Sequence, residues 1–328
     1  MAATETLLRV SNYDLDATLD SGQAFHWEPD NGSWVGVIGR HGVRLTRTCD
    51  GIRAATAGPV AGWQWLRDYL QTDTDLDAVL KTFPDDAPMR DAVAACRGLR
   101  VLRQDPWECL ASFILSSTKQ IVQIRQIIAL LCERFGEPLV GAAAIWERRR
   151  RAGQQHHNEP GYSPAGRQRS QASISLPDGE TSGTLSQGNH LSHSFPSPEK
   201  IASLTDPDLR ACKMGFRAPY LLAAAQKVAG GELDLEGLRR LPLAAARGEL
   251  TALRGVGGKI ADCVLLFAYG FDGAFPVDVW VARALRELYF PRRRVGDQRL
   301  RHFAATHFGP HAGYAQQYLF HYMRTKMK

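Results

Sequence analysis

Residues 253–263 read LRGVGGKIADC, so that three glycines fall within residues 255–258 and Lys259 follows directly. The preceding stretch LAAARGELTAL has helical spacing, and the apolar residues after Lys259 recur every three or four positions as far as Gly270. The sequence therefore predicts two helices joined by a tight hairpin. Such a hairpin exposes backbone N–H groups at the start of its second helix, where they can bind phosphate oxygens whatever the nucleotide sequence.

The glycines also admit two other interpretations. An ordinary glycine corner between two helices fits the same residues as well as a phosphate site does. A nucleotide-binding P-loop fits poorly, because the GxxxxGK[ST] spacing is missing and no strand is predicted before the glycines. The choice between a phosphate-binding hairpin and a plain corner therefore stays open on local grounds.

Asp278 stands in FDGAFPVDVWVARALREL (271–288), directly before a second helical run that it is predicted to cap. A helix over 258–270 is about 18 Å long, and the link of seven residues that follows spans at most about 23 Å. The Asp278 carboxylate can therefore come back to Lys259. A neutral lysine amine is a nucleophile, and a nearby carboxylate can accept its proton and stabilise a developing cation. The pair is a candidate for attack at a sugar carbon of DNA; the alternative is a structural lysine with a capping aspartate.

The composition is that of a globular protein with a moderately basic charge balance. The chain has 328 residues, 44% of them hydrophobic, and 40 Lys and Arg against 34 Asp and Glu. Its formal charge of +6 favours a polyanionic partner without requiring one. Six cysteines without a CxxC pair indicate reduced thiols in an intracellular protein rather than a zinc ribbon or a disulfide framework. No run of about 18 apolar residues and no signal-like start occurs, so we expect neither a membrane span nor secretion.

The pattern along the chain predicts an α+β fold with an N-terminal antiparallel sheet and a mainly helical remainder. Between residues 5 and 58, turn signals separate short β-prone runs such as SWVGVIG and VRLTRTC, which is typical of a meander. Beyond Trp63 the apolar spacing is helical. In QDPWECLASFILSSTKQIVQIRQIIALL (104–131), Asp105 before a proline marks a helix start, and the polar residues 116–120 predict a corner between two helices.

We expect three segments. Residues 1–85 form an N-terminal sheet domain with helices, and residues 86–146 and 195–328 form the helical region. Residues 147–194 lack apolar periodicity and are rich in polar residues, glycine and proline, so we predict a disordered insertion within the helical region. The arginine run 148–151 is either a nuclear-import or DNA-binding patch or, as we favour, part of a solvated linker. The histidines of the insertion are irregularly spaced, which disfavours a metal site.

Six separate motifs stand in one order along the chain and cover most of it apart from the insertion. They are DSGQAFHW (20–27), VLRQDPWECLASFILSS (101–117), MGFRAPYL (214–221), LRGVGGKIADC (253–263), PVDVW (276–280) and FGPHAGYAQQYLF (308–320). Together they resemble the helix-hairpin-helix (HhH-GPD) glycosylase superfamily, and within it most closely the 8-oxoguanine DNA glycosylases.

This resemblance implies a bifunctional DNA glycosylase and AP lyase of base excision repair that acts on 8-oxoguanine. Lys259 would attack the sugar C1′, expel the base and form a Schiff base, while Asp278 activates the amine and stabilises the oxocarbenium-like state. β-Elimination would then nick the strand. The chemistry requires no metal or organic cofactor. The hairpin amides of Gly255, Gly257 and Ile260 would bind a DNA phosphate.

The resemblance also assigns a pocket for the flipped base to Gly22, Cys263, Gln316 and Phe320. 8-Oxoguanine carries a hydrogen at N7 where guanine has a lone pair, so a backbone carbonyl placed there accepts from the lesion and repels guanine. Gly22 would supply this carbonyl, because its missing side chain lets the backbone approach. Gln316 and Phe320 share a helix face, so the amide can bind the Watson–Crick edge and the ring can stack. Without the resemblance these residues are a turn glycine, core residues and a surface glutamine.

The chain departs from the family pattern where relatives contact the orphaned cytosine. Residues 118–120 are Thr-Lys-Gln in place of an Asn-rich tripeptide, and Gln123 replaces an arginine. Thr118 and Arg217 are then candidates for DNA contacts, with Arg217 available for the cytosine. Trp280 stands where a phosphate-contacting histidine often lies. The preference for lesions opposite cytosine is therefore open.

The sequence also allows other functions to be weighed. Endonuclease III-like and adenine glycosylases usually end in a four-cysteine iron–sulfur loop, and no cysteine follows Cys263. Alkylbase glycosylases usually lack the hairpin lysine. A glycosylase for another damaged base and a non-catalytic DNA-binding protein stay open as alternatives. We expect a monomer, because one flipped nucleotide needs one pocket, with double-stranded DNA containing 8-oxoguanine as its partner. Its expected location is intracellular and DNA-associated: nucleoid or cytoplasm in a bacterium, nucleus in a eukaryote.

Overall fold

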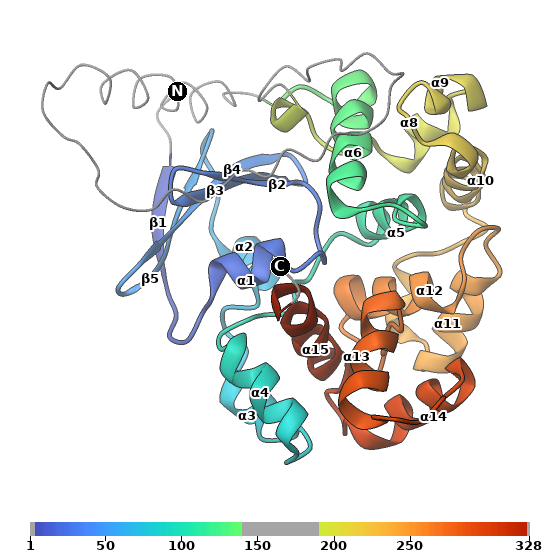
Figure 1. The fold of residues 1–328 in the computed structure, drawn as a ribbon. Coiled ribbons are helices and arrows are strands. Elements are labelled where there is room, and N and C mark those ends of the chain that lie inside the picture. The colour runs from blue at the N-terminus through green and yellow to red at the C-terminus, as the bar shows by residue number, and fades with distance from the viewer. Residues whose placement is uncertain (1–3, 140–189, 327–328) are drawn as a thin grey trace, which may run out of the picture.

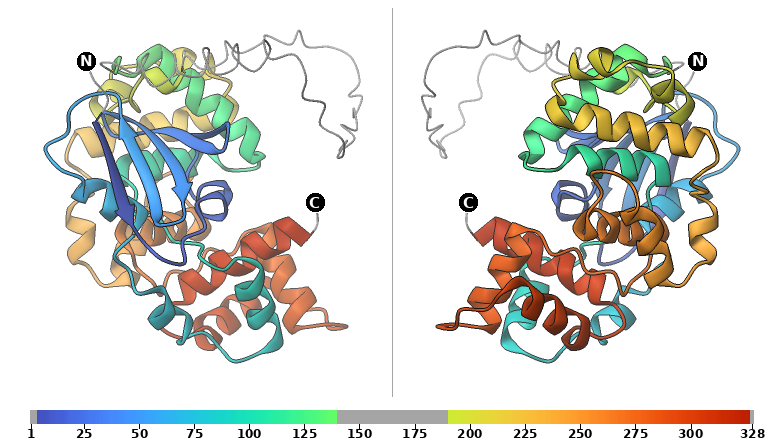
Figure 2. Two further views of the ribbon diagram at one scale, coloured as in Figure 1. Left: turned by 90° about the vertical axis from the view of Figure 1, so that its left-hand side faces the viewer. Right: turned by 90° about the vertical axis from the view of Figure 1, so that its right-hand side faces the viewer.

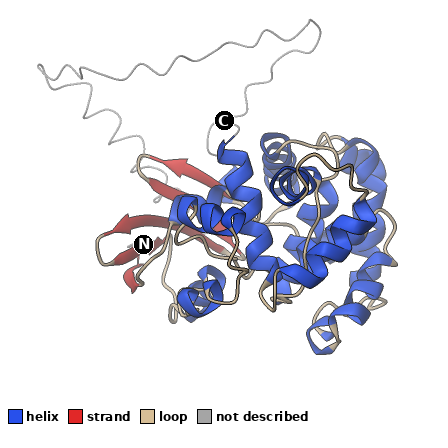
Figure 3. Ribbon diagram, turned by 60° about the horizontal axis from the view of Figure 1, so that its bottom comes forward, coloured by secondary structure: helices blue, strands red, loops and turns tan. Residues whose placement is uncertain are grey.

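The computed structural model describes residues 4–139 and 190–326 and divides them between a sheet and a larger helical region (Figure 1). Viewed from one side, the sheet lies in front of the helices (Figure 2, left), and the strands gather at one end of the molecule (Figure 3). This arrangement confirms the predicted α+β class. In the described residues no helix is long and apolar enough to cross a membrane.

The sheet has five antiparallel strands in the order β1-β5-β4-β3-β2. The last four form the predicted meander, and β1 pairs with β5 at its edge. The bounds are β1 (Thr4–Arg9), β2 (Trp27–Asp30), β3 (Ser33–Ile38), β4 (His41–Thr48) and β5 (Gly51–Thr56).

A short helix, α1 (Leu15–Asp20), lies between β1 and β2, within the stretch interpreted from its sequence as a meander. Asp14 caps it by accepting from the Ala17 N–H at 2.9 Å. Leucines of α1 and of α2 (Gln64–Leu70) pack with Trp27 and the inward-facing aliphatic residues of the sheet. This packing fixes the end of α1, so the turn that follows it, which contains Gly22, has a defined place.

The helical region contains one large apolar core. Leu76 and Val79 of α3 already belong to this core, ahead of the expected domain boundary after residue 85. The helices are α3 (Leu76–Leu80), α4 (Ala87–Ala95), α5 (Pro106–Leu115), α6 (Ile121–Phe135), α8 (Pro198–Ala202), α9 (Asp206–Arg210), α10 (Ala218–Ala229), α11 (Leu243–Thr251), α12 (Gly258–Val264), α13 (Val279–Tyr289), α14 (Asp297–His307) and α15 (Ala312–Lys326), with short 3₁₀ turns η1 (His190–Ser192), η2 (Gly215–Arg217) and η3 (Gly237–Arg240).

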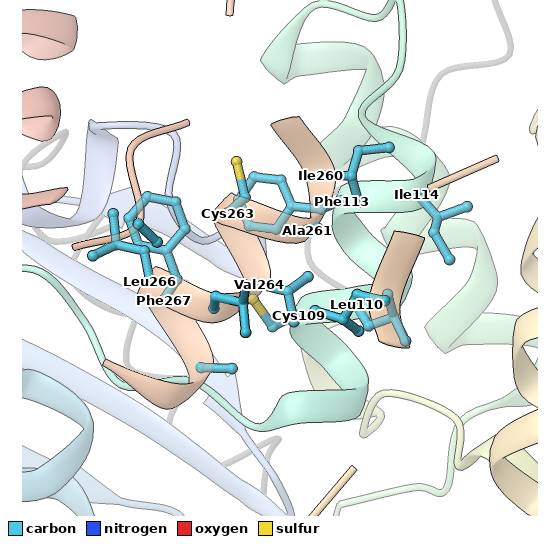
Figure 4. Close-up of a cluster of buried hydrophobic side chains, with 14 of the residues drawn as sticks. Cys109, Leu110, Phe113, Ile114, Ile260, Ala261, Cys263, Val264, Leu266 and Phe267 are labelled. Carbon is cyan, nitrogen blue, oxygen red and sulfur yellow. The ribbon is translucent and has the colours of Figure 1, made fainter. Parts of the chain in front are cut away.

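The predicted hairpin is present as α11, a turn and α12. The second helix continues as a π-helical turn, η4 (Leu265–Tyr269), and ends where Gly270 adopts φ +72°. The helix therefore has the predicted length, but its second half is a π-helix, which is wider than an α-helix. Figure 4 shows the apolar faces of α5 and of α12 with η4 pointing toward one another, including Phe113, Val264 and Phe267. This contact places the hairpin beside the corner between α5 and α6.

Of the predicted disordered insertion, 147–194, residues 147–189 lie outside the described residues. Its last residues are packed: Leu191 contacts Val35 and Val37 on the sheet, and Ser194 N donates to Glu137 O at 2.9 Å. The prediction of disorder is therefore wrong for these last residues, because one leucine among polar residues suffices to anchor the chain on an apolar sheet face.

Candidate active site

Lys259 lies in the first turn of α12, directly after the hairpin glycines. Its Nζ donates to Ser116 Oγ at 3.3 Å and lies 5.3 Å from the centroid of the Phe113 ring. Both contacts come from α5 and its C-terminal end, so the packing of α12 on α5 determines where the amine points. The side chain is half-buried, which limits its access to bulk water.

Asp278 caps α13, as the sequence predicted: its Oδ1 accepts from Val281 N at 2.8 Å. Burial raises the pKa of this carboxyl above its ordinary value, while the Val281 N–H and the positive charge of Lys259 act in the opposite direction. Capping and proximity to Lys259 are thus compatible roles of one side chain. A carboxyl with a raised pKa beside an amine is suited to accepting a proton.

A cavity of about 40 Å³ separates these two residues from the C-terminal helix. It has room for about one or two waters, so a purine can enter only if side chains move. The cavity brings together Lys259, Asp278 and all four predicted base-pocket residues. Its lining is Gly22, Phe113, Lys259, Cys263, Phe267, Pro276, Asp278, Gln316, Gln317 and Phe320.

Four of the lining residues were not predicted from the sequence. Phe267 could have been found, because it stands one helical turn after Cys263 on the same face. Gln317 is adjacent to a predicted residue but was assigned no role. Phe113 and Pro276 reach the cavity only through tertiary packing, so no local signal pointed to them.

Gln316 and Cys263 form two contrasting walls of the cavity. Gln316 is only 4% exposed, and its Oε1 has no hydrogen-bond partner within the described chain. Buried polar atoms without partners are rare, and this one lines a cavity that a ligand can fill. Burial raises the pKa of Cys263 to about 12, with the carboxylates of Asp278 and Asp262 adding to the effect. The thiol is therefore protonated near neutral pH and acts as a small apolar surface.

Gly22 approaches the cavity with its backbone. Its φ is +74°, and a Cβ atom would lie 2.9 Å from Ile121 Cδ1 and 3.5 Å from Phe320 Cε1. Both the left-handed conformation and the lack of space require glycine here. The structure therefore places a side-chain-free stretch of backbone against the predicted base pocket.

The hairpin has an open face with free amides. A Cβ on Gly257 or Gly258 would meet nothing within 4 Å, whereas one on Gly255, at φ +85°, would collide with the Tyr220 ring. The first hydrogen bond of α12 runs from Ala261 N to Gly257 O at 3.0 Å. The backbone N–H groups of residues 257–260 therefore have no partner in the described residues. The buried side chain of Ile260 leaves only its backbone for a ligand.

Thr118 and Arg217 meet each other at the corner between α5 and α6. Arg217 is 2% exposed, and its guanidinium donates to Thr118 Oγ1 at 2.6 Å and to Ser117 O at 2.8 Å. In the free protein Arg217 therefore braces the corner that carries Ser116, and a DNA contact requires release of some of these bonds. Phe216, which was not predicted, is 52% exposed, and the guanidinium lies 4.2 Å from its ring centroid. It presents an aromatic surface beside the site.

The described residues contain no group of three or more His, Cys, Asp or Glu that could hold a metal ion. The six cysteines are all free thiols. The polar side chains that line the cavity are the Lys259 amine, the Asp278 carboxyl, the Cys263 thiol and the amides of Gln316 and Gln317.

Comparison with known proteins relates the chain to DNA repair glycosylases. Residues 6–110 match the model of the 8-oxoguanine DNA glycosylase N-terminal domain, and residues 111–306 match that of the HhH-GPD superfamily of base excision DNA repair proteins. A protein of Methanothermobacter thermautotrophicus described as "Probable N-glycosylase/DNA lyase" is 28% identical over 324 residues, which cover 96% of this chain and 95% of its own. The N-glycosylase/DNA lyase OGG1 of Arabidopsis thaliana is 26% identical over 93% of this chain and 76% of its own.

A solved structure agrees with these sequence matches. The Clostridium acetobutylicum 8-oxoguanine glycosylase/lyase, in complex with double-stranded DNA containing cytosine opposite to 8-oxoG, superimposes with a TM-score of 0.78 and 27% identity. The match covers 100% of this chain and 99% of that one. Both the sheet and the helical region therefore have counterparts in that enzyme.

Proposed function

Because this chain belongs to the HhH-GPD superfamily of base excision DNA repair proteins, we propose that it is a bifunctional DNA glycosylase and AP lyase that excises 8-oxoguanine. The observation that carries the proposal is that Lys259, Asp278 and the unpaired amide oxygen of Gln316 line the same cavity. A nucleophile, a proton acceptor and a base-binding group thus face one space.

In the proposed reaction, the Lys259 amine forms a bond to C1′ while the N-glycosidic bond breaks and the base leaves with the bonding electron pair. Asp278 accepts a proton from the amine and stabilises the positive charge that develops on the sugar. Ring opening gives a Schiff base, and loss of a C2′ proton then breaks the C3′–O bond and nicks the strand.

For substrate recognition we propose four pocket residues. The Gly22 carbonyl accepts from N7–H of 8-oxoguanine, Gln316 binds the Watson–Crick edge, and Phe320 and Cys263 enclose the base. The hairpin amides of Gly255, Gly257 and Ile260 bind a phosphate, and Thr118 and Arg217 lie beside the opposite strand. The partner is double-stranded DNA and the protein acts as a monomer, in whichever intracellular compartment holds the DNA: the nucleoid or cytoplasm of a bacterium, or the nucleus of a eukaryote.

Covalent trapping tests this proposal. Incubation with an 8-oxoguanine duplex and borohydride is expected to give a stable protein–DNA adduct, which Lys259→Gln abolishes. Lys227→Gln, on the exposed side of α10 where Lys227 pairs with Glu232, is the matched control and should leave trapping unchanged. Adduct with a different oxidised base but not with 8-oxoguanine would indicate another glycosylase of the family. No adduct with any oxidised base, together with retained DNA binding, would indicate a non-catalytic DNA-binding protein.

A further inference from the structure

The backbone carbonyls of the turn after α1 differ in whether they accept hydrogen bonds. Of the four successive carbonyls of residues 20–23, three accept hydrogen bonds from side chains. Arg324 Nη1 donates to Asp20 O at 2.9 Å, Gln317 Nε2 to Ser21 O at 3.0 Å, and Gln104 Nε2 to Gln23 O at 2.7 Å. The carbonyl of Gly22 has no partner in the described part of the chain.

Two of these donors come from one stripe of α15. Gln317 and Arg324 are seven positions apart, and Phe320 lies between them, so the three share a face of the helix. The Arg324 guanidinium also lies 5.5 Å from the centroid of the Phe320 ring. The helix face that closes the cavity therefore also fixes the turn that approaches it.

The same turn is tied to the rest of the protein by further bonds. Arg125 of α6 forms an ion pair with the Asp20 side chain at 3.3 Å. The buried Gln23 side chain donates to Arg100 O at 2.8 Å. Gly22 itself has more conformational freedom than any other residue type, so the position of its carbonyl depends on these neighbouring bonds rather than on its own backbone preference.

We propose that Gln317 and Arg324 are positioning residues that hold the Gly22 carbonyl where it accepts the N7–H of a flipped 8-oxoguanine. The inference rests on the proposed function and adds the structural basis of its selectivity. 8-Oxoguanine and guanine differ at N7 by one hydrogen, and a hydrogen bond weakens steeply when its length or angle departs from the optimum. A displaced turn therefore lowers selection of the lesion before it affects Lys259.

The proposal separates two activities of the same protein. Removal of 8-oxoguanine needs the Gly22 carbonyl, whereas nicking of a duplex that already contains an abasic site needs only Lys259 and its surroundings. Single-turnover rates are measured on three duplexes of one sequence, containing 8-oxoguanine, guanine or an abasic site opposite cytosine. Loss of one positioning hydrogen bond is expected to slow 8-oxoguanine excision about tenfold, with abasic nicking changed less than about twofold.

The informative variants are Gln317→Met and Arg324→Met, which keep most of the side-chain volume but cannot donate. Gln317 lines the cavity and Arg324 does not. The positive charge of Arg324 also acts to lower the pKa of Asp278, so abasic nicking is measured to detect any effect of Arg324→Met on that carboxyl. Arg324→Lys, which can still donate to Asp20 O, should recover part of the excision rate. Thr325→Ala, on the exposed side of the same helix, is the control and should behave as the wild type.

A selective loss of 8-oxoguanine excision in both methionine variants, with partial recovery in Arg324→Lys, supports the proposal. Unchanged excision in both variants, or an equal loss of excision and abasic nicking, overturns it. If the wild-type protein nicks abasic DNA but does not excise 8-oxoguanine, the proposed substrate is wrong and the inference fails with it. That result is distinct from a wild type that excises 8-oxoguanine and variants that do so equally well.

Discussion

Lys259 Nζ and Ser116 Oγ lie 3.3 Å apart, and this hydrogen bond fixes the amine in the free protein. The Ser116 hydroxyl donates its own hydrogen to Phe113 O at 2.7 Å, so it can only accept from Lys259. Within the described residues the amine forms no ion pair with Asp278, although both line one cavity. The hydroxyl of Ser116, and not the Asp278 carboxylate, therefore holds the amine in place.

Replacing Ser116 with Ala is expected to slow Schiff-base formation about 5- to 10-fold, because an ordered amine becomes mobile when it loses one hydrogen bond. Borohydride trapping under single-turnover conditions measures the rate. Ser117→Ala is the matched control, since its hydroxyl contacts only Ile114 O, at 3.4 Å, and should leave the rate within about twofold. Equal effects of the two substitutions would mean that the corner, and not the bond to Lys259, is responsible.

Asp278→Asn should separate capping from catalysis. Asparagine caps a helix about as well as aspartate, so α13 is expected to stay intact while the excision rate falls at least about 100-fold. Asp278→Ala should lose both the cap and the activity. Thermal unfolding and single-turnover excision, measured on both variants, test this pair. A large loss of stability in the asparagine variant would show that the carboxylate itself is needed for folding.

The raised pKa of Asp278 also has a consequence for stability. Because burial raises this pKa in the folded state, the folded protein binds the proton more tightly than the unfolded chain does. The contribution of Asp278 to stability is therefore largest below the pKa of the unfolded chain, which is about 3.9. It falls as the pH rises toward the higher folded pKa, and above the folded pKa the loss of stability is complete. Asp278→Asn is expected to be as stable as the wild type or more stable at pH 7, with the difference disappearing at acid pH. A wild type that is more stable at pH 7 would contradict this.

Gly255 and Gly257 are expected to respond differently to alanine. A methyl group at Gly255 forces a side chain into φ +85° and into the Tyr220 ring, which should destabilise the fold by about 1–3 kcal/mol. At Gly257 the added Cβ meets nothing within 4 Å, so stability should change by less than about 1 kcal/mol. Because the open face is the proposed phosphate site, Gly257→Ala should nevertheless weaken binding to duplexes with and without a lesion. Unchanged DNA affinity in this variant would remove the phosphate site from the hairpin.

The sequence predicted those parts of the structure that depend on local patterns. The helical hairpin, the cap at Asp278 and the meander each follow from the spacing of apolar, glycine and capping residues. The pocket residues were predicted through the motifs, and Gln316 and Phe320 reach it from one helix face, as their spacing indicated.

The remaining features depend on contacts between distant parts of the chain. The bond from Gln317 to Ser21 O joins residues 296 positions apart, and the burial of Arg217 depends on carbonyls of a corner about 100 positions earlier. The π-helical turn that follows α12 could not be predicted from the sequence either. Apolar residues spaced by three and four positions fit an α-helix and a single wider turn equally well. Such features are decided when the elements pack, and no local signal carries them.

The connection between α13 and α14 carries three exposed arginines, Arg292, Arg293 and Arg294, none of which forms an ion pair within the described chain. Arg292 adopts φ +65°, so the backbone turns sharply at the first of them. In both side views this connection projects from the same side of the molecule as the C-terminal end of α15 (Figure 2). The α13 helix, which starts at the Asp278 cap, is about 16 Å long, equivalent to about five base pairs of DNA.

We expect these arginines to contact phosphates about five base pairs from the lesion. Changing all three to Gln should weaken binding to a 25-base-pair duplex and reduce the slope of log K against log salt concentration by about 2–3, or roughly 0.9 per lost phosphate contact. On a duplex that ends three base pairs from the lesion on each side, the variant and the wild type should bind alike, because the phosphates that the arginines contact are absent. The charge-matched control removes three exposed arginines of the sheet, Arg9, Arg47 and Arg53, and should leave the slope unchanged. Equal slopes for both triple variants would show that only net charge matters, and an unchanged slope for the loop variant would place this loop away from DNA.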